Sequence, residues 1–344
     1  MCGLPACFRR GVAEMTGAAI VAADSARLRR PSREAIRPVL IFAAFALLPL
    51  LAAWTRQQYL LDVAARMMVF AVAALALDLL VGYGGLISFG HAAFIGLGAY
   101  AVGILSAEGI RDALVSLPVA IAVSMLFAWL TGIVCLRTRG AYFIMITLAF
   151  GQMVYFVATS LELYGGDNGL SVAARNTVAG WPLLKSDRAF YYFTLASLLA
   201  AYLFCRALAV SRFGRVLRGA KENATRMATI GFKVRQFQLV AYVIAGALGG
   251  LSGFLLANLT EFVAPTYMSW QQSGELLVMV ILGGAGTLDG AILGTVAYLV
   301  ASEWLSAWVV NWQVIFGPIL VLVVLFARGG LIGLSQRLWR SGHG

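Results

Sequence analysis

Long apolar segments separated by short polar loops follow one another along most of this chain. A helix needs about 20 apolar residues to cross the hydrocarbon core of a bilayer, and ten segments approach that length. They comprise residues 38–54, 67–82, 86–107, 113–136, 141–161, 189–209, 237–257, 273–284, 290–307 and 312–327. Because several of them are short, the pattern predicts an all-α, polytopic integral membrane helical bundle of about 8–10 transmembrane helices.

The segment at 273–284 has the weakest apolar character of the ten. Glu275 lies within it, and the glycines at 283, 284 and 286 leave barely half a span of apolar residues. A re-entrant segment is an alternative to a full span here, since irregular backbone is tolerated at membrane depth where protein covers it.

Composition supports the membrane class. Of the 344 residues, 61% are hydrophobic and 12% are charged, whereas a soluble domain carries about 25% charged residues. The formal charge is +11, and the basic residues lie between apolar segments, as membrane topology requires. Nucleic acid is therefore not an expected partner. The four cysteines have no paired spacing, which argues against both a disulfide framework and a zinc site.

The domain organisation follows from the same pattern. Residues 1–37 contain seven arginines and three acids and are predicted to form a basic cytoplasmic N-terminal tail, which an early start-codon assignment would also produce. The apolar stretch at 18–23 is too short for the core of a signal peptide. Residues 38–327 form the transmembrane domain, with a cytoplasmic loop at about 206–236, and residues 328–344 form a cytoplasmic C-terminal tail.

The loop at 206–236 is the most basic part of the chain. Basic residues in short loops are retained in the cytoplasm, and alternation places Arg137 and Arg139 on the same face. An amphipathic helix is predicted within the loop because apolar residues recur among the charges, at Val216, Leu217, Ala220, Ala224 and Met227. Such a helix is either a contact surface for another protein or a set of charges that only determines topology.

Glycines recur at every fourth position in two late segments. Gly246 and Gly250 form one pair, and Gly286, Gly290 and Gly294 form a longer series. In a membrane this spacing lets helix backbones approach closely. The simplest interpretation is helix packing, and the alternative is that these strips allow helices to slide during transport.

A cluster of glycines also interrupts an apolar run. Gly82, Gly84, Gly85 and Gly90 precede His91, and broken helices of this kind line substrate pathways in transporters. A second and weaker glycine cluster at residues 283–290 predicts that the chain consists of two related halves. Ionisable groups within apolar segments are candidates for a functional site, although a structural hydrogen bond explains them equally well; these groups are Asp78, His91, Glu275, Asp289 and Glu303.

Catalytic and nucleotide-binding motifs are missing from the sequence. A phosphate-binding loop needs a lysine after glycine, and the three lysines follow Leu184, Ala220 and Phe232. The two histidines, His91 and His343, cannot form the H-E-x-x-H zinc motif. We therefore expect no catalytic residues, no metal and no cofactor in this chain, and any ATP must be bound by a separate chain.

Several motifs in order resemble a known family. ALDLLVGYGGLISFGHAAF at 76–94 is followed by GAY at 98–100, LRTRG at 136–140, TLAFG at 147–151 and GGDNG at 165–169. This series resembles the permease subunits of branched-chain amino acid ABC importers, more narrowly the LivM type of the LivM/LivH permease family. The resemblance covers about residues 40–333.

The resemblance implies a function and a set of partners. The helix at 211–231 would be a coupling helix in a groove of a cytoplasmic ATPase, with five contact candidates: Arg215, Arg218, Lys221, Glu222 and Gly231. The chain would work in the bacterial inner membrane by alternating access, together with a second permease subunit, two ATPase subunits and a periplasmic substrate-binding protein. Both termini would be cytoplasmic.

Some positions depart from the family pattern. The family usually has an acid at Ala224, Ala141 and Gln152 and a proline at Arg328, so an ion pair from position 224 to the ATPase is in doubt. The stretch at 268–275 is closer to relatives that handle urea, amides or aromatic acids. These solutes are therefore alternative substrates to branched-chain amino acids. A stand-alone secondary transporter or channel is the main alternative, and a membrane-embedded enzyme, which lacks a catalytic cluster here, is the second.

Overall fold

The computed structural model describes residues 36–55, 59–172, 174–178, 180–181, 183–308, 314, 316–318 and 330–333. The chain divides between Leu47 and Leu48 into two units, and helix α2 (Ile36–Thr55) crosses this division. The predicted tails at 1–37 and 328–344 and the predicted segment at 312–327 lie outside the described residues, apart from a few positions in each.

Six described helices are long and apolar enough to cross a membrane. They are α3 (Tyr59–Asp78), which continues as the π-helical turn η1 (Leu79–Tyr83), α5 (Ala113–Cys135), α6 (Ala141–Ser160), α7 (Asp187–Val210), α9 (Val234–Thr260) and α11 (Leu288–Trp308). Three shorter helices accompany them, α4 (His91–Ala107), α8 (Arg212–Thr229) and α10 (Trp270–Gly283). These helices confirm the predicted all-α membrane bundle.

The remaining elements are short. Strands β1 (Leu170–Ser171) and β2 (Phe262–Val263) pair antiparallel. Single 3-10 turns occur as η2 (Glu162–Tyr164), η3 (Gly166–Asn168), η4 (Leu183–Lys185) and η5 (Pro265–Met268).

Helices α3 and α9 form the core of the second unit. The most apolar window of α3 is 78% buried and that of α9 is 67% buried, whereas in α6 the figure is 22%. Helix α3 contacts α7, α9, α10 and α11, and α9 also contacts α4 and α5. The outer helices α5 and α6 keep large apolar side chains on the surface, such as Trp129 and Phe156, as expected for helices that face lipid.

Two strips of glycine on α9 determine how closely its neighbours approach. A Cβ atom on Gly250 would lie 2.7 Å from the Ala120 carbonyl oxygen of α5, and one on Gly253 would lie 2.0 Å from the Ile95 carbonyl oxygen of α4. Gly246 lies on the α5 side as well, near Ala128. The helices therefore meet backbone to backbone, an arrangement in which dispersion between close surfaces supplies the attraction.

The contact between α10 and α11 is built in the same way. A Cβ on Gly294 would lie 2.1 Å from the Met279 carbonyl oxygen, and one on Gly290 would lie 2.8 Å from the Gly283 carbonyl oxygen. Gly286 does not share this strip, because α11 begins at Leu288 and Gly286 lies in the preceding loop with φ +89°.

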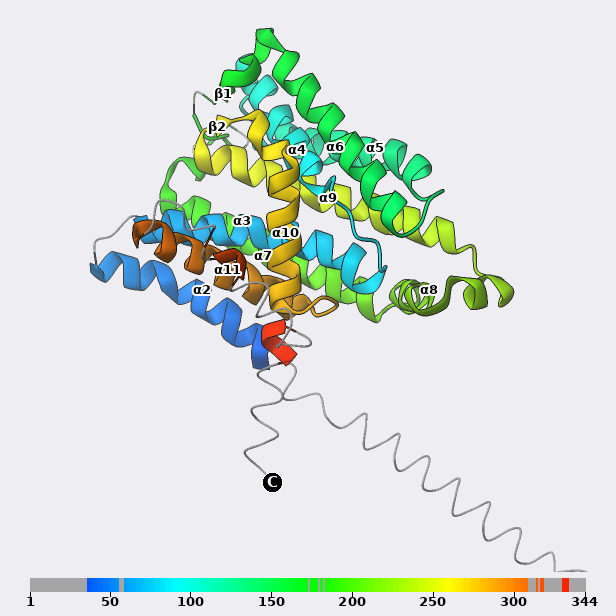
Figure 1. Ribbon diagram of the computed structural model, residues 1–344. Coiled ribbons are helices and arrows are strands. Elements are labelled where there is room, and N and C mark those ends of the chain that lie inside the picture. The colour runs from blue at the N-terminus through cyan, green and yellow to red at the C-terminus, as the bar shows by residue number, and fades with distance from the viewer. Residues whose placement is uncertain are drawn as a thin grey trace, which may run out of the picture. The chain divides into compact units, whose positions relative to one another are not determined.

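Three predicted boundaries differ from the structure. Helix α3 begins at Tyr59 rather than at residue 67, because Asp62 and Arg66 lie within the helix instead of ending it. Helix α4 begins at His91 rather than at residue 86, since residues 84–90 have no helical structure. The weak segment at 273–284 becomes α10, which has 14 residues and runs across the direction of α3, α9 and α11 (Figure 1).

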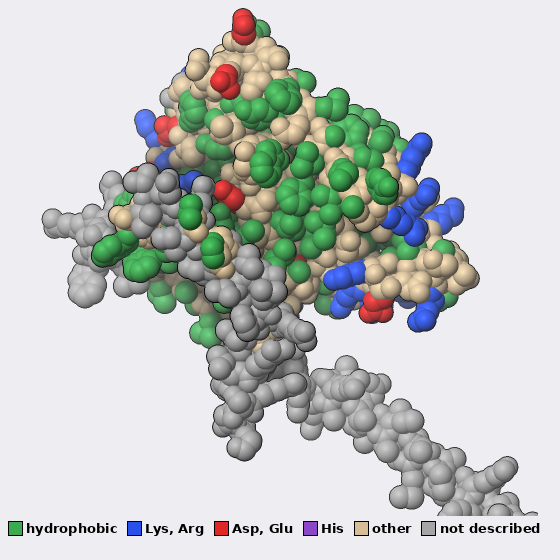
Figure 2. All heavy atoms as spheres, in the orientation of Figure 1, with side chains coloured by type: hydrophobic (Ala, Val, Ile, Leu, Met, Phe, Trp, Pro, Cys, Tyr) green, Lys and Arg blue, Asp and Glu red, His purple; other side chains and the backbone are tan. Residues whose placement is uncertain are grey.

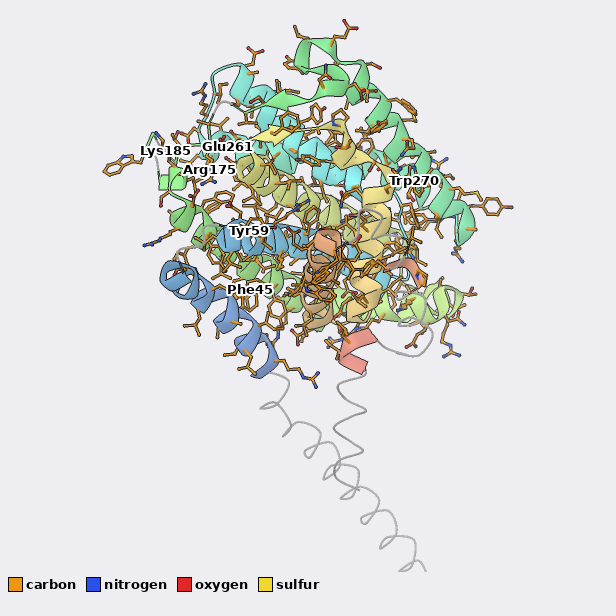
Figure 3. The ribbon with its side chains drawn as sticks, turned by 60° about the vertical axis from the view of Figure 1, so that its left-hand side comes forward. Phe45, Tyr59, Arg175, Lys185, Glu261 and Trp270 are labelled. Atoms are coloured by element: carbon orange, nitrogen blue, oxygen red, sulfur yellow. The ribbon has the colours of Figure 1, made fainter. Side chains whose placement is uncertain are left out.

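The loops of the second unit gather at two ends. Basic side chains cluster at the end where α8 lies, and hydrophobic side chains cover the surface beside it (Figure 2). At the other end, the backbone N–H of Ala113 donates to the Thr177 carbonyl (2.7 Å), and Arg175 pairs with Asp187 (2.6 Å) and Glu261 (3.5 Å). Figure 3 shows Arg175 and Glu261 close together there. The loops at 108–112, 162–188 and 261 thus share one end.

Candidate functional site

Helix α8 follows α7 after a single turn residue. Ser211 caps α8 by accepting a hydrogen bond from the Gly214 backbone N–H (3.4 Å), while its hydroxyl donates to the Leu208 carbonyl (2.7 Å). A Cβ on Gly214 would lie 2.5 Å from the carbonyl oxygens of both Leu208 and Ala209. Only glycine fits at this position, so the sequence S-R-F-G builds a sharp turn from a membrane helix into a surface helix.

Asn223 divides α8 into two pieces. Its φ of −154° and ψ of 96° are not helical, and its side-chain oxygen accepts from the Arg226 backbone N–H (2.9 Å), which caps the second piece. That piece ends in a Schellman motif: Gly231, with φ +97°, donates to the Ala228 carbonyl (3.0 Å), and Phe232 donates to the Met227 carbonyl (3.1 Å). The predicted single amphipathic helix is therefore a kinked pair.

The first piece of α8 has one face on the bundle and one face exposed. Val216, Leu217 and Ala220 are buried, while Arg215 and Glu222 are exposed. The second piece is less covered. Of its predicted apolar positions, Ala224 and Met227 are only half-buried, and a Cβ on Gly219 would meet the Met227 sulfur at 2.8 Å, so Met227 folds back over the first piece.

Two of the five predicted ATPase contacts, although exposed, make contacts within the protein through their charged groups. The Arg218 guanidinium donates to the Ala209 carbonyl (2.5 Å) and lies 5.4 Å from the centroid of the Tyr83 ring. The Lys221 ammonium donates to the Gly82 carbonyl (2.8 Å). A cation is held by the ring quadrupole in the first case and by a charge-assisted hydrogen bond in the second. Arg215 and Glu222 lie on the exposed side of α8, and Gly231 is exposed just beyond its end.

The first glycine cluster lies beneath Lys221. A Cβ on Gly85, whose φ is +66°, would lie 2.8 Å from Cγ of Lys221, and one on Gly84 would lie 3.7 Å from Cδ1 of Leu217. Gly84 and Gly85 thus let α8 rest directly on the backbone that follows η1.

The same turn contacts the second glycine cluster. The buried Asp78 carboxylate accepts a hydrogen bond from the Gly286 backbone N–H (2.6 Å). A Cβ on Gly82 would lie 2.3 Å from that same nitrogen. The two glycine-rich segments, about 200 residues apart in sequence, therefore pack on one another. Together they form a continuous series of contacts from α8 through η1 to the loop before α11.

Gly90 and His91 lie apart from this series. A Cβ on Gly90 would lie 2.3 Å from the Thr147 carbonyl oxygen of α6. His91 is fully buried, and its ring stands edge-on to Phe94 at 5.3 Å. Within the described residues, neither ring nitrogen makes a hydrogen bond of ordinary geometry. The ring nevertheless lies near the backbone of Ala73.

The other ionisable groups in apolar segments have separate positions. Asp289 accepts a hydrogen bond from the Tyr202 hydroxyl (2.7 Å). Glu275 and Glu303 line a cavity at the end of the bundle away from α8, together with Asp62 and Arg66. The sequence interpretation missed Asp62 and Arg66 because it began the second span at residue 67. Two opposite charges four residues apart, directly before an apolar run, were the available signal.

Comparisons with known proteins agree with this architecture. Residues 59–325 match the family described as branched-chain amino acid transport system / permease component. The chain is 27% identical, over 317 residues, to the high-affinity branched-chain amino acid transport system permease protein LivM of Escherichia coli K12, which covers 85% of this chain and 74% of that protein. No solved structure matches the chain.

More distant relatives include both permease types. LivM of Methanocaldococcus jannaschii is 23% identical, covering 76% of this chain and 90% of that protein. LivH of Escherichia coli K12 is 22% identical, covering 78% of this chain and 92% of that protein. The family match extends over far more than half of the length of this chain. The chain therefore belongs to the permease components of branched-chain amino acid transport systems.

Proposed function

We propose that this chain is one of two membrane-spanning subunits of an ABC importer for branched-chain amino acids or a related small polar solute. Its partners are a second permease subunit of the same family, two cytoplasmic ATPase subunits that bind ATP, and a periplasmic substrate-binding protein. The importer lies in the inner membrane with the α8 end and both termini in the cytoplasm. The relatives support this reading because LivM and LivH are permease proteins of one kind of transport system.

The observation that carries the proposal is the two-sided character of α8. Its exposed face offers Arg215, Glu222 and Arg226, charges that a partner can pair. Its inner face is joined to η1 through Lys221. A push on the exposed face therefore reaches backbone at the end of the central helix α3. Such a push changes the side of the membrane from which solute can enter only if the bundle has two conformations and the ATPases favour one of them.

Charge reversal on the exposed face of α8 tests the coupling role. We expect Arg215→Glu with Arg226→Glu to weaken co-purification with the ATPase subunits by at least about thirtyfold, since losing paired charges at an interface costs about 2–5 kcal/mol. Membrane insertion should be unchanged. Arg218 is left intact because its contacts are internal. Arg111→Glu with Arg188→Glu, at the opposite end, is the matched control.

Two results would contradict the proposal. The double variant at Arg215 and Arg226 could bind the ATPases as tightly as the native chain. Alternatively, the purified chain alone could accumulate solute in liposomes under a sodium or proton gradient, which would establish the stand-alone transporter instead.

A further inference from the structure

A cavity of about 550 Å³ lies between α3, α9, α10 and α11. Tyr59, Thr260 and Ser306 mark its outer part, at the helix ends away from α8. Along α3 it reaches from Tyr59 to Phe70, a rise of about 16 Å over eleven residue steps of 1.5 Å. This is about half of the roughly 30 Å hydrocarbon thickness. The volume is within the range of about 300–1,000 Å³ that is usual for small-molecule sites.

Charges of both signs line this one cavity. Arg66 and Asp62 come from α3, Glu275 from α10 and Glu303 from α11. Arg66 is exposed, its guanidinium forms no ion pair within the described residues, and it lies 6.0 Å from the centroid of the Phe70 ring. Charged groups at membrane depth are costly unless they are paired or serve a pathway. Arg66 is thus a cation available to an anionic group of a ligand.

The carboxylates differ in the hydrogen bonds that they accept. Glu303 accepts a hydrogen bond from the Tyr59 hydroxyl and so links α11 to α3 near the mouth. The half-buried Glu275 accepts one long hydrogen bond, from the Gln272 side chain (3.3 Å). A carboxylate can accept about four hydrogen bonds, so Glu275 has capacity for a cationic group of a ligand.

The rest of the wall is largely apolar. Phe70 and Tyr298 are buried at its inner part, and Leu256 faces it from α9. A ligand that satisfies this cavity therefore carries a cation, an anion and an apolar portion.

We propose that this cavity binds a zwitterionic α-amino acid with an apolar side chain during its passage through the permease. Arg66 binds the carboxylate, Glu275 binds the ammonium group, and Phe70, Leu256 and Tyr298 contact the side chain. This inference rests on the proposed function and chooses among its substrates. Urea and simple amides carry neither charge, and an aromatic acid without an amino group would meet three carboxylates against one guanidinium. The permease itself thus contributes to selectivity.

Protection of an introduced cysteine tests the site directly. Ser302 lines the cavity, so Ser302→Cys is made in the full chain with Cys2 and Cys7 changed to serine; Cys135 and Cys205 are buried. In nanodiscs, we expect L-leucine to slow alkylation of this cysteine at least about tenfold. The probes 4-methylpentanoate, 3-methylbutylamine and urea, each lacking one or both charged groups, should protect poorly. Ser160→Cys, at the end of α6 and away from the cavity, should show no protection.

Charge variants identify the contacts. We expect Arg66→Gln and Glu275→Gln each to raise the leucine concentration needed for half protection at least about tenfold, since a hydrogen bond to a charged group contributes about 1.5–3 kcal/mol. Arg66→Lys, which keeps the charge, should retain protection. In Arg66→Gln, 3-methylbutylamine should protect as well as leucine does. The controls Arg111→Gln and Glu162→Gln, on exposed loops, should behave like the native chain.

Separate outcomes overturn the site and the proposed function. Absence of leucine protection at Ser302→Cys, equal protection by leucine and the three probes, or unchanged protection in Arg66→Gln and Glu275→Gln overturns the amino-acid site. ATP-driven leucine uptake by the co-purified complex is measured in parallel. Normal uptake in both variants removes the site but leaves the permease role, whereas failure of the native chain to associate with any ATPase removes the permease role itself.

Discussion

At the scale of single residues, the direction of a charged side chain decides its role. Arg215, Arg218 and Lys221 are all exposed residues of one basic helix, yet Lys221 donates to the Gly82 carbonyl and Arg218 lies over the Tyr83 ring. A lysine has a long apolar stem and a charged head, and here the stem lies over Gly85. Lys221 is thus suited to join α8 to the backbone of η1.

Replacement of this lysine tests the link. Lys221→Met keeps the stem and removes the hydrogen bond to Gly82. We expect ATPase association to persist while solute transported per ATP hydrolysed falls severalfold. We also expect a stability loss of about 1.5 kcal/mol, the lower end for a hydrogen bond to a charged group, because Lys221 is exposed. Uptake and ATP hydrolysis measured together in proteoliposomes show the ratio. Lys233→Met, an exposed lysine outside the contact, is the control, and an equal ratio in both variants would refute the link.

At the scale of helices, small residues fix the distances between elements. The strips on α9 bring α4 and α5 to backbone contact, and the kink at Asn223 gives α8 two short pieces instead of one. The predicted packing glycines Gly246, Gly250, Gly290 and Gly294 all lie where a side chain would meet another element. Gly286 instead takes part in the contact between the two glycine clusters.

Two alanine substitutions separate packing from helix propensity. Gly253→Ala would place a methyl group 2.0 Å from the Ile95 carbonyl oxygen, whereas Gly274→Ala would meet only a ring carbon of Phe89 at 3.8 Å. Overpacking costs roughly 1–3 kcal/mol, while glycine to alanine within a helix gains up to about 1 kcal/mol. We expect Gly253→Ala to lower the melting temperature in detergent and Gly274→Ala to leave it equal or raised. Equal melting of both variants would contradict close backbone packing of α9.

At the scale of the whole molecule, the separation of charge between the two ends gives the proposed orientation. The exposed arginines at 137, 139, 212 and 215 lie at the α8 end, and the cluster of Arg175, Asp187 and Glu261 lies at the other. Basic residues in short loops are retained in the cytoplasm, so the α8 end should be cytoplasmic.

Cysteine labelling checks this orientation. In a background without Cys2 and Cys7, Leu163→Cys, at a position 84% exposed, should react with a membrane-impermeant maleimide in cells whose outer membrane alone is permeabilised. Arg215→Cys should react only after the inner membrane is opened as well. Labelling of Arg215→Cys under the first condition would reverse the proposed orientation and remove the coupling role of α8.

The sequence by itself determined the class of fold, the alternation of loops between two ends and the existence of an amphipathic basic helix. Each of these follows from local patterns of apolar and charged residues, which the bilayer makes decisive. The tertiary structure alone decided that Lys221 lies on Gly82, that Asp78 binds Gly286, and that Arg66 and Glu275 line one cavity. These contacts join residues far apart in the chain, and no local pattern specifies which distant backbone a side chain will meet.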